Sequence, residues 1–186
     1  MGELISIIDS QYSSGLALLD FLKEQQQITL FNEAENNFRK TILLSAASYF
    51  EKELTETVTD LAKSHSDNNE LIVSIIKQKA IIRQYHTYFD WENAKSANKF
   101  FSMFGDTFKN KMSQKVKDDP DFDSSIKAFL EIGQERNKMV HQNFAEIVID
   151  KTAEEIYKLS KLSLYFIEIM KLELIKTPAA VVLPQE

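Results

Sequence analysis

Apolar side chains recur along most of this chain at the three- and four-residue spacing of an amphipathic helix. The first such pattern predicts a helix over residues 3 to about 26, and a second, longer pattern runs from Phe31 towards Leu61. Ser, Asp and Asn crowd residues 64–69, which predicts a break, and a third helix is expected over about 70–83. This part of the chain is therefore predicted to be helical apart from one turn.

The middle of the chain is less regular. Aromatic residues gather over 85–106, where we expect short helices mixed with connecting loop. Trp91, the single tryptophan, is expected to act as a packing anchor. Residues 107–117 then predict a short basic helix.

The run DDPDFDSS predicts the start of the next helix. Pro120 suits a first helical turn, and we expect Asp121 or Asp123 to accept hydrogen bonds from the free N–H groups there. The positions expected to point inward are Phe122, Ile126, Phe129, Leu130, Gly133 and Val140. Gly133 has two interpretations, a close helix approach at a dimer seam or a tolerated helix glycine.

The last helix has a clear start signal. Thr152 and Glu155 fit a capping box and predict a helix from 153 to about 175. Together the patterns predict an all-α fold, an up-and-down helical bundle of about five main helices plus short helices. We expect residues 1–176 to form a single helical domain and 177–186 to be a short tail.

Composition narrows the class of protein. The 186 residues, 44% hydrophobic and 27% charged, fit one globular domain, and four Gly with three Pro favour long helices. The absence of Cys excludes a disulfide framework and thiol catalysis. Because no apolar stretch is long enough to span a bilayer and no signal peptide is recognisable, we expect a cytoplasmic protein without a membrane partner.

The segment QERNKMVHQNF holds the residues with the clearest chemistry, Arg136 and His141. A histidine exchanges a proton near neutral pH, and an arginine holds a phosphate while staying charged. Together they suffice to cleave RNA without a metal, by attack of the ribose 2′-OH on the adjacent phosphorus. Residues five apart on a helix diverge by about 140°, so the pair shares a face poorly unless the helix ends there. Asn137 lies one turn before His141 and can orient the ring or a phosphate.

The run from Arg136 to His141 resembles the R-x4-6-H signature of the HEPN superfamily. LLSAASYFEKEL, at 43–54, is similar to the second helix of RiboL-PSP-type HEPN domains. SANKFFSMFGDTF, at 96–108, resembles the segment that those proteins place before the motif helix. The likeness covers about residues 30–172.

The resemblance implies a homodimer or an intramolecular pair, in which two such motifs face each other and cut RNA without metal or cofactor, leaving a 2′,3′-cyclic phosphate. It implies that Arg136 stabilises the transition state, that His141 is the acid and base, and that Asn137 is a polar helper. Glu51 would be a supporting carboxylate. It also implies a toxin or antiviral-defence effector, with an RNA substrate and an antitoxin or sensor protein as a further partner.

Basic residues concentrate locally, although the net charge of −6 argues against unspecific nucleic-acid binding. Residues 95–117 carry six lysines opposed by one aspartate. The residues we expect to bind RNA are Lys109, Lys111 and Lys115, together with Lys138. Three phenylalanines of this segment lie at helical spacing, so we expect them in the core rather than stacked on bases; they are Phe100, Phe101 and Phe104.

Other interpretations stay open. The chain could be a catalytically inactive HEPN module that binds RNA, a nucleotide or a partner protein, or a helical scaffold without a nucleic-acid role. The motif pair would then be a surface arginine and a helix-end histidine, and Glu51 a solvated residue. His65 and His86 have no second ligand at metal-binding spacing, so no metal site is predicted.

Overall fold

The computed structural model of the chain describes residues 2–141 and 146–175, with side chains over 7–140 and 146–175. Every regular element in these ranges is a helix, and no strand occurs in them. The all-α prediction is therefore confirmed. None of the described helices is long and apolar enough to cross a membrane.

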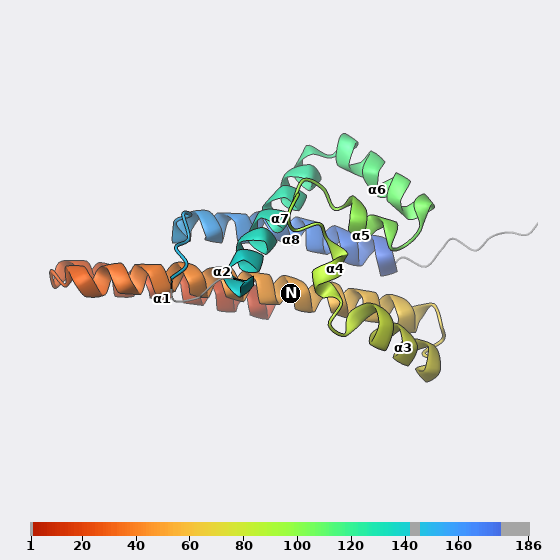
Figure 1. The fold of residues 1–186 in the computed structure, drawn as a ribbon, viewed down its shortest axis with the longest axis horizontal. Helices are drawn as coiled ribbons and strands as arrows, with labels where there is room; N and C mark the ends of the chain where they lie inside the picture. Colours follow the sequence, from red (N-terminus) through yellow and green to blue (C-terminus); the bar gives the residue numbers. More distant parts are fainter. Residues whose placement is uncertain (1, 142–145, 176–186) are drawn as a thin grey trace, which may run out of the picture.

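Helix α2 (Ile28–Ser64) is the longest element and crosses the whole width of the molecule in Figure 1. Its 37 residues rise about 55 Å. Helix α1 (Gly2–Glu24) lies along the first half of α2, and α8 (Ala153–Ile175) packs against α2 as well. The apolar stripe predicted for α2 is buried, at Phe38, Ile42, Ala46, Tyr49, Phe50, Leu54 and Val58.

The predicted break and third helix are present, with one difference. Helix α3 (Glu70–Ile76) is capped by Asn69, whose side-chain oxygen accepts hydrogen bonds from the N–H groups of Leu71 and Ile72. It continues into a π-helical turn, η1 (Lys77–Ile81), so the helical stretch ends two residues before the predicted limit of about 83 and its last part is not α-helical.

The irregular aromatic segment folds as predicted into short helices and loop. These are α4 (Tyr85–Tyr88) and α5 (Asn98–Ser102), followed by the basic helix α6 (Asp106–Asp118). Phe100 and Phe101 are fully buried, whereas Phe104 is partly buried against the core.

Helix α7 (Pro120–His141) begins at the predicted proline but is capped by a different aspartate. Oδ1 of Asp119 accepts a hydrogen bond of 2.9 Å from the Phe122 N–H, and its Oδ2 accepts one of 2.8 Å from the Tyr165 hydroxyl. These bonds hold the pKa of Asp119 below its usual value. Assigning the cap to Asp121 or Asp123 was wrong, because the cap residue stands outside the helix, directly before the proline.

The inward face of α7 is as predicted in its first half, with Phe122, Ile126, Phe129 and Leu130 buried. The prediction fails in the last turn. Val140 is 57% exposed, and Met139 is buried instead. Buried residues occur on more than one face in the middle of α7. The spacing of its apolar residues therefore does not reveal which face is buried in the last turn.

Helix α8 begins with the predicted capping box. The Thr152 hydroxyl accepts a hydrogen bond from the Glu155 N–H, and the Glu155 carboxylate accepts one from the Thr152 N–H, at 3.2 and 2.8 Å. The helix ends at Ile175, as predicted. The tail predicted over 177–186 lies outside the described residues.

Aromatic rings join these elements into one core. Phe129 of α7 lies between Phe166 of α8 and Phe89 of the loop after α4, with ring centroids 4.7 and 4.9 Å apart. Such ring pairs stabilise a fold beyond the apolar area that they bury. The core therefore fixes α7 relative to α8 and to the loop that follows α4.

Candidate active site around Arg136

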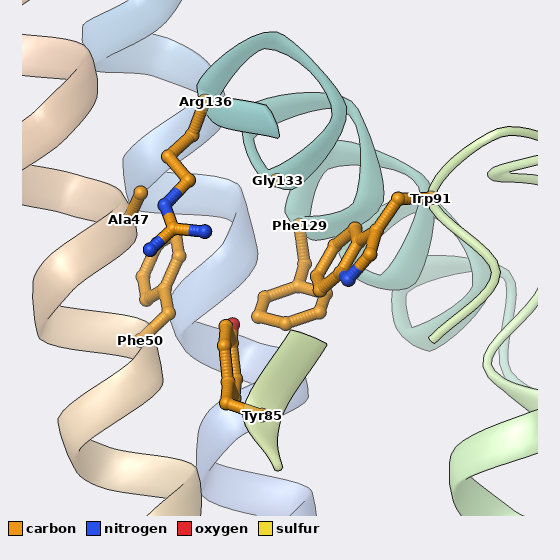
Figure 2. Close-up of a pocket in the computed structure, with 7 residues that line it drawn as sticks. All are labelled: Ala47, Phe50, Tyr85, Trp91, Phe129, Gly133 and Arg136. Atoms are coloured by element: carbon orange, nitrogen blue, oxygen red, sulfur yellow. The ribbon is translucent and has the colours of Figure 1, made fainter. Parts of the chain in front are cut away.

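Arg136 projects from α7 towards α2, where Ala47 and Phe50 flank it (Figure 2). Its guanidinium lies 3.4 Å from the Glu51 carboxylate of α2. Both side chains are partly exposed, Arg136 to 30% and Glu51 to 40%. Because an exposed ion pair of this length contributes little to stability, the guanidinium remains able to bind another anion.

Below the guanidinium lies a small pocket formed by three helices and one loop. Its lining comprises Ala47, Phe50, Tyr85, Trp91, Phe129, Gly133 and Arg136. The free volume of about 10 Å³ admits roughly one water molecule. A space this small admits no larger ligand, which must therefore bind on the exposed side of Arg136.

Tyr85 of α4 forms part of this pocket and is buried. Its burial raises the pKa of the hydroxyl far above the usual value, the nearby Glu51 carboxylate raises it further, and Arg136 lowers it. Tyr85 therefore presents a neutral phenol to this pocket and not a second anion.

Gly133 lets the Trp91 ring approach α7 one turn before Arg136. A Cβ atom built on Gly133 would lie 2.0 Å from Cζ3 of Trp91, which no side chain tolerates. The indole N–H of Trp91 donates a 3.0 Å hydrogen bond to the His86 carbonyl. The predicted packing role of Trp91 is confirmed. Gly133 allows a close contact with Trp91 within the same chain, whereas one interpretation from the sequence placed it at a dimer seam.

The motif residues lie along the last turns of α7. Asn137 is half-buried, whereas Lys138 is exposed and pairs with Glu135 at 2.7 Å. His141 is the last residue of the helix, and its side chain lies outside the described part of the structure. Because α7 stays helical to His141, positions 136 and 141 diverge by about 140°, whereas 137 and 141 share a face.

The lysines predicted to bind RNA are not all brought together. Those of α6 lie at the opposite end of α7 from the motif (Figure 1). Lys111 of α6 pairs with Glu173 at 2.5 Å, whereas Lys109 and Lys115 form no ion pair with a described residue. Only Lys138 adjoins Arg136 in sequence.

Among the described side chains, no group of three or more His, Asp or Glu residues lies close enough together to hold a metal ion. His65 is the cap residue directly after α2, and its ring lies 3.1 Å from the Leu61 carbonyl. His86 is exposed on α4. The site around Arg136 thus offers a cation, a carboxylate and a neutral phenol.

A family model described as RiboL-PSP-HEPN matches residues 12–176. The chain belongs to this family. The match includes α2 with Glu51 and all of α7, so the contact between Arg136 and Glu51 is internal to the HEPN domain. Comparisons with curated proteins and with solved structures found no match.

Two residues of the HEPN domain near Arg136 were not identified as site residues from the sequence. Tyr85 belongs to a helix of four residues, too short to show a periodic pattern. Trp91 was predicted to pack, but its position beside Arg136 depends on the contact with Gly133. The aromatic richness of this segment is the only signal that could have directed attention to either.

Proposed function

We propose that this HEPN domain is a metal-independent endoribonuclease that works as a homodimer. The observation that carries the proposal is the partly exposed guanidinium of Arg136, which lies 3.4 Å from the Glu51 carboxylate of α2 and belongs to the helix that ends at His141. The family supports a nuclease or nucleotide-related role for such a domain.

In the proposed reaction the ribose 2′-oxygen attacks the adjacent phosphorus while His141 accepts the 2′-OH proton. The bond from phosphorus to the 5′-oxygen breaks, and the leaving oxygen takes up a proton from the protonated His141. The products are a 2′,3′-cyclic phosphate and a 5′-OH end. Arg136 neutralises the charge that develops on the phosphoryl oxygens, while Glu51 and Asn137 position the arginine and the histidine.

Two features support a dimer. Positions 136 and 141 face different directions on one α7, so the arginine of one copy and the histidine of the other can flank one phosphate. Val140, within the motif, is 57% exposed, and Val148, after it, is 72% exposed. Burying these apolar side chains against a second copy would favour association.

Family membership also supports a role as a toxin or antiviral-defence effector, whose cutting an antitoxin or sensor protein would control. Lys138, Lys109, Lys111 and Lys115 are the residues we propose to contact RNA. Unregulated cleavage should then stop the growth of cells that express the chain.

A second candidate function is that of an inactive HEPN module that binds RNA, a nucleotide or a partner protein. It is favoured by the pairing of Arg136 with Glu51 within the chain and by the net charge of −6. Such a module would bind RNA without cutting it.

Cleavage of labelled RNA in excess EDTA separates these functions. We expect cutting to persist in EDTA and the products to carry 2′,3′-cyclic phosphate and 5′-OH ends, because the attacking group is the substrate's own hydroxyl. The matched control is the same strand with 2′-deoxyribose at the cut positions, which should stay intact. Dependence on magnesium or cutting of the deoxy-substituted strand would refute the mechanism, and binding without cutting would identify the inactive module.

A further inference from the structure

Many cations in the described part of the chain form an ion pair with a carboxylate. Ion pairs of this kind include Lys63 with Asp60, Lys127 with Asp123, Lys138 with Glu135, Lys158 with Glu154 and Lys161 with Asp9. The segment 95–117 is different, because among described residues five of its six lysines form no ion pair. These five are Lys95, Lys99, Lys109, Lys115 and Lys117.

Lys95 and Lys117 border a pocket of about 210 Å³ between the loop before α5, helix α6 and the first turns of α7. Its remaining lining residues are Ser96, Ala97, Asn98, Phe101, Ser113, Val116, Asp123 and Ile126. The pocket therefore combines two exposed ammonium groups and several hydrogen-bonding groups with an apolar floor, of which Phe101 and Ile126 are fully buried.

The electrostatics of this pocket favour an anion. Asp123 is the only carboxylate in the lining, and the Lys127 ammonium neutralises it at 2.6 Å. The Ser113 hydroxyl donates to the Asn98 side-chain oxygen at 3.3 Å, which leaves the N–H groups of that amide free to donate. Ammonium, hydroxyl and amide groups together match the oxygens of a phosphate.

The pocket is linked to the site around Arg136 by the connection from α4 to α5, which runs beside α7 (Figure 1). Trp91, at the start of this loop, lines the Arg136 pocket, and Lys95 lines the second pocket. The loop is held to α7 by a 3.4 Å hydrogen bond from the Gln134 amide to the Glu92 carbonyl. Along α7, Ile126 lies about 15 Å from Arg136, a distance that a short single strand can span.

We propose that this second pocket binds a phosphate group, carried by an RNA strand or by a free nucleotide. Lys95 and Lys117 hold the phosphate oxygens, and the apolar floor contacts the attached sugar or base. The assignment to RNA rests on the proposed nuclease function, whereas the affinity of the pocket for phosphate does not.

The test is calorimetric titration of the full chain with four probes: AMP, adenosine, inorganic phosphate, and a 2′-O-methyl oligonucleotide without terminal phosphate, which cannot be cut. We expect AMP to bind at least about tenfold more tightly than adenosine, because only AMP offers a charged phosphate to the two lysines. The double variant Lys95→Gln/Lys117→Gln should weaken AMP binding by about tenfold.

The matched control is Lys77→Gln/Lys79→Gln, which removes two exposed lysines from η1 and should change AMP affinity by less than about twofold. Preferential binding of the oligonucleotide would identify the RNA backbone as the source of the phosphate, and preferential binding of AMP a free nucleotide.

Equal losses in the two lysine double variants, unchanged affinity in Lys95→Gln/Lys117→Gln, or equal binding of AMP and adenosine would overturn the phosphate site. Failure of the nuclease proposal gives a different result. RNA would then stay uncut in every condition, while AMP binding would still depend on Lys95 and Lys117.

Discussion

Replacing His141 by alanine is expected to lower the rate of RNA cleavage by about 10²–10⁴-fold, because the imidazole is the group proposed to take the 2′-OH proton. The described titratable side chains beside it on α7, Glu135 and Lys138, pair with each other. Arg136→Ala should lower the rate by about 10²–10³-fold, since charge on the phosphoryl oxygens would lose its fixed counter-charge. Initial rates on one labelled RNA in EDTA measure both effects. Arg136 is partly exposed and His141 is the last residue of α7, so circular dichroism should show an unchanged helical fold.

Controls for these variants come from the same chain. His65→Ala and Arg83→Ala remove an exposed histidine and an exposed arginine that lie outside the motif. Each should cut RNA within about twofold of the wild-type rate, because surface substitutions away from a site have small effects. Retention of activity in His141→Ala, or an equal loss in His65→Ala, would show that the catalytic proton transfer lies elsewhere.

Gly133→Ala is expected to destabilise the domain by about 1–2 kcal/mol, although alanine is the better helix former. The new Cβ would lie 2.0 Å from a ring atom of the buried Trp91. Overpacking of this kind costs about 1–3 kcal/mol, whereas the gain in helix propensity is at most about 1 kcal/mol. Urea unfolding followed by circular dichroism measures the difference, and cleavage should fall because Trp91 also borders the Arg136 pocket.

The matched background for this substitution is Trp91→Phe, which removes the outer ring atoms that Gly133 faces. In that background, adding Gly133→Ala should be neutral or stabilise the domain by up to about 1 kcal/mol, through helix propensity alone. If the alanine is equally destabilising in both backgrounds, the contact with Trp91 is not the reason for the glycine.

Local patterns in the sequence were sufficient to predict where the long helices lie. The apolar stripe of α2, the proline that begins α7 and the capping box of α8 each act within a few residues, so their signals survive without tertiary information. Two predictions failed where several local choices were equivalent. The run DDPDFDSS offers several aspartates as caps, and only the backbone path selects Asp119. The last turn of α7 offers Val140 and Met139, and only the neighbouring elements decide which is buried.

The candidate site was predicted from resemblance more than from pattern. Arg136 and Glu51 are 85 positions apart, and nothing local connects them; the resemblance named both, and the structure places them in contact. Their proposed roles in catalysis stay predictions. The pocket between Lys95 and Lys117 could not be predicted, because it depends on how a loop, α6 and α7 meet. Periodicity identifies faces of single helices but not the spaces between them.

The central claim is that the arginine of one copy and the histidine of the other act on the same phosphate. Mixed dimers test it directly: Arg136→Ala and His141→Ala chains with different affinity tags are expressed together and purified through both tags. Each parent dimer lacks one essential group at both sites, whereas the mixed dimer retains one complete site of two. We therefore predict that mixed dimers cut RNA at about half the wild-type rate. Mixed dimers as inactive as either parent would contradict the shared site.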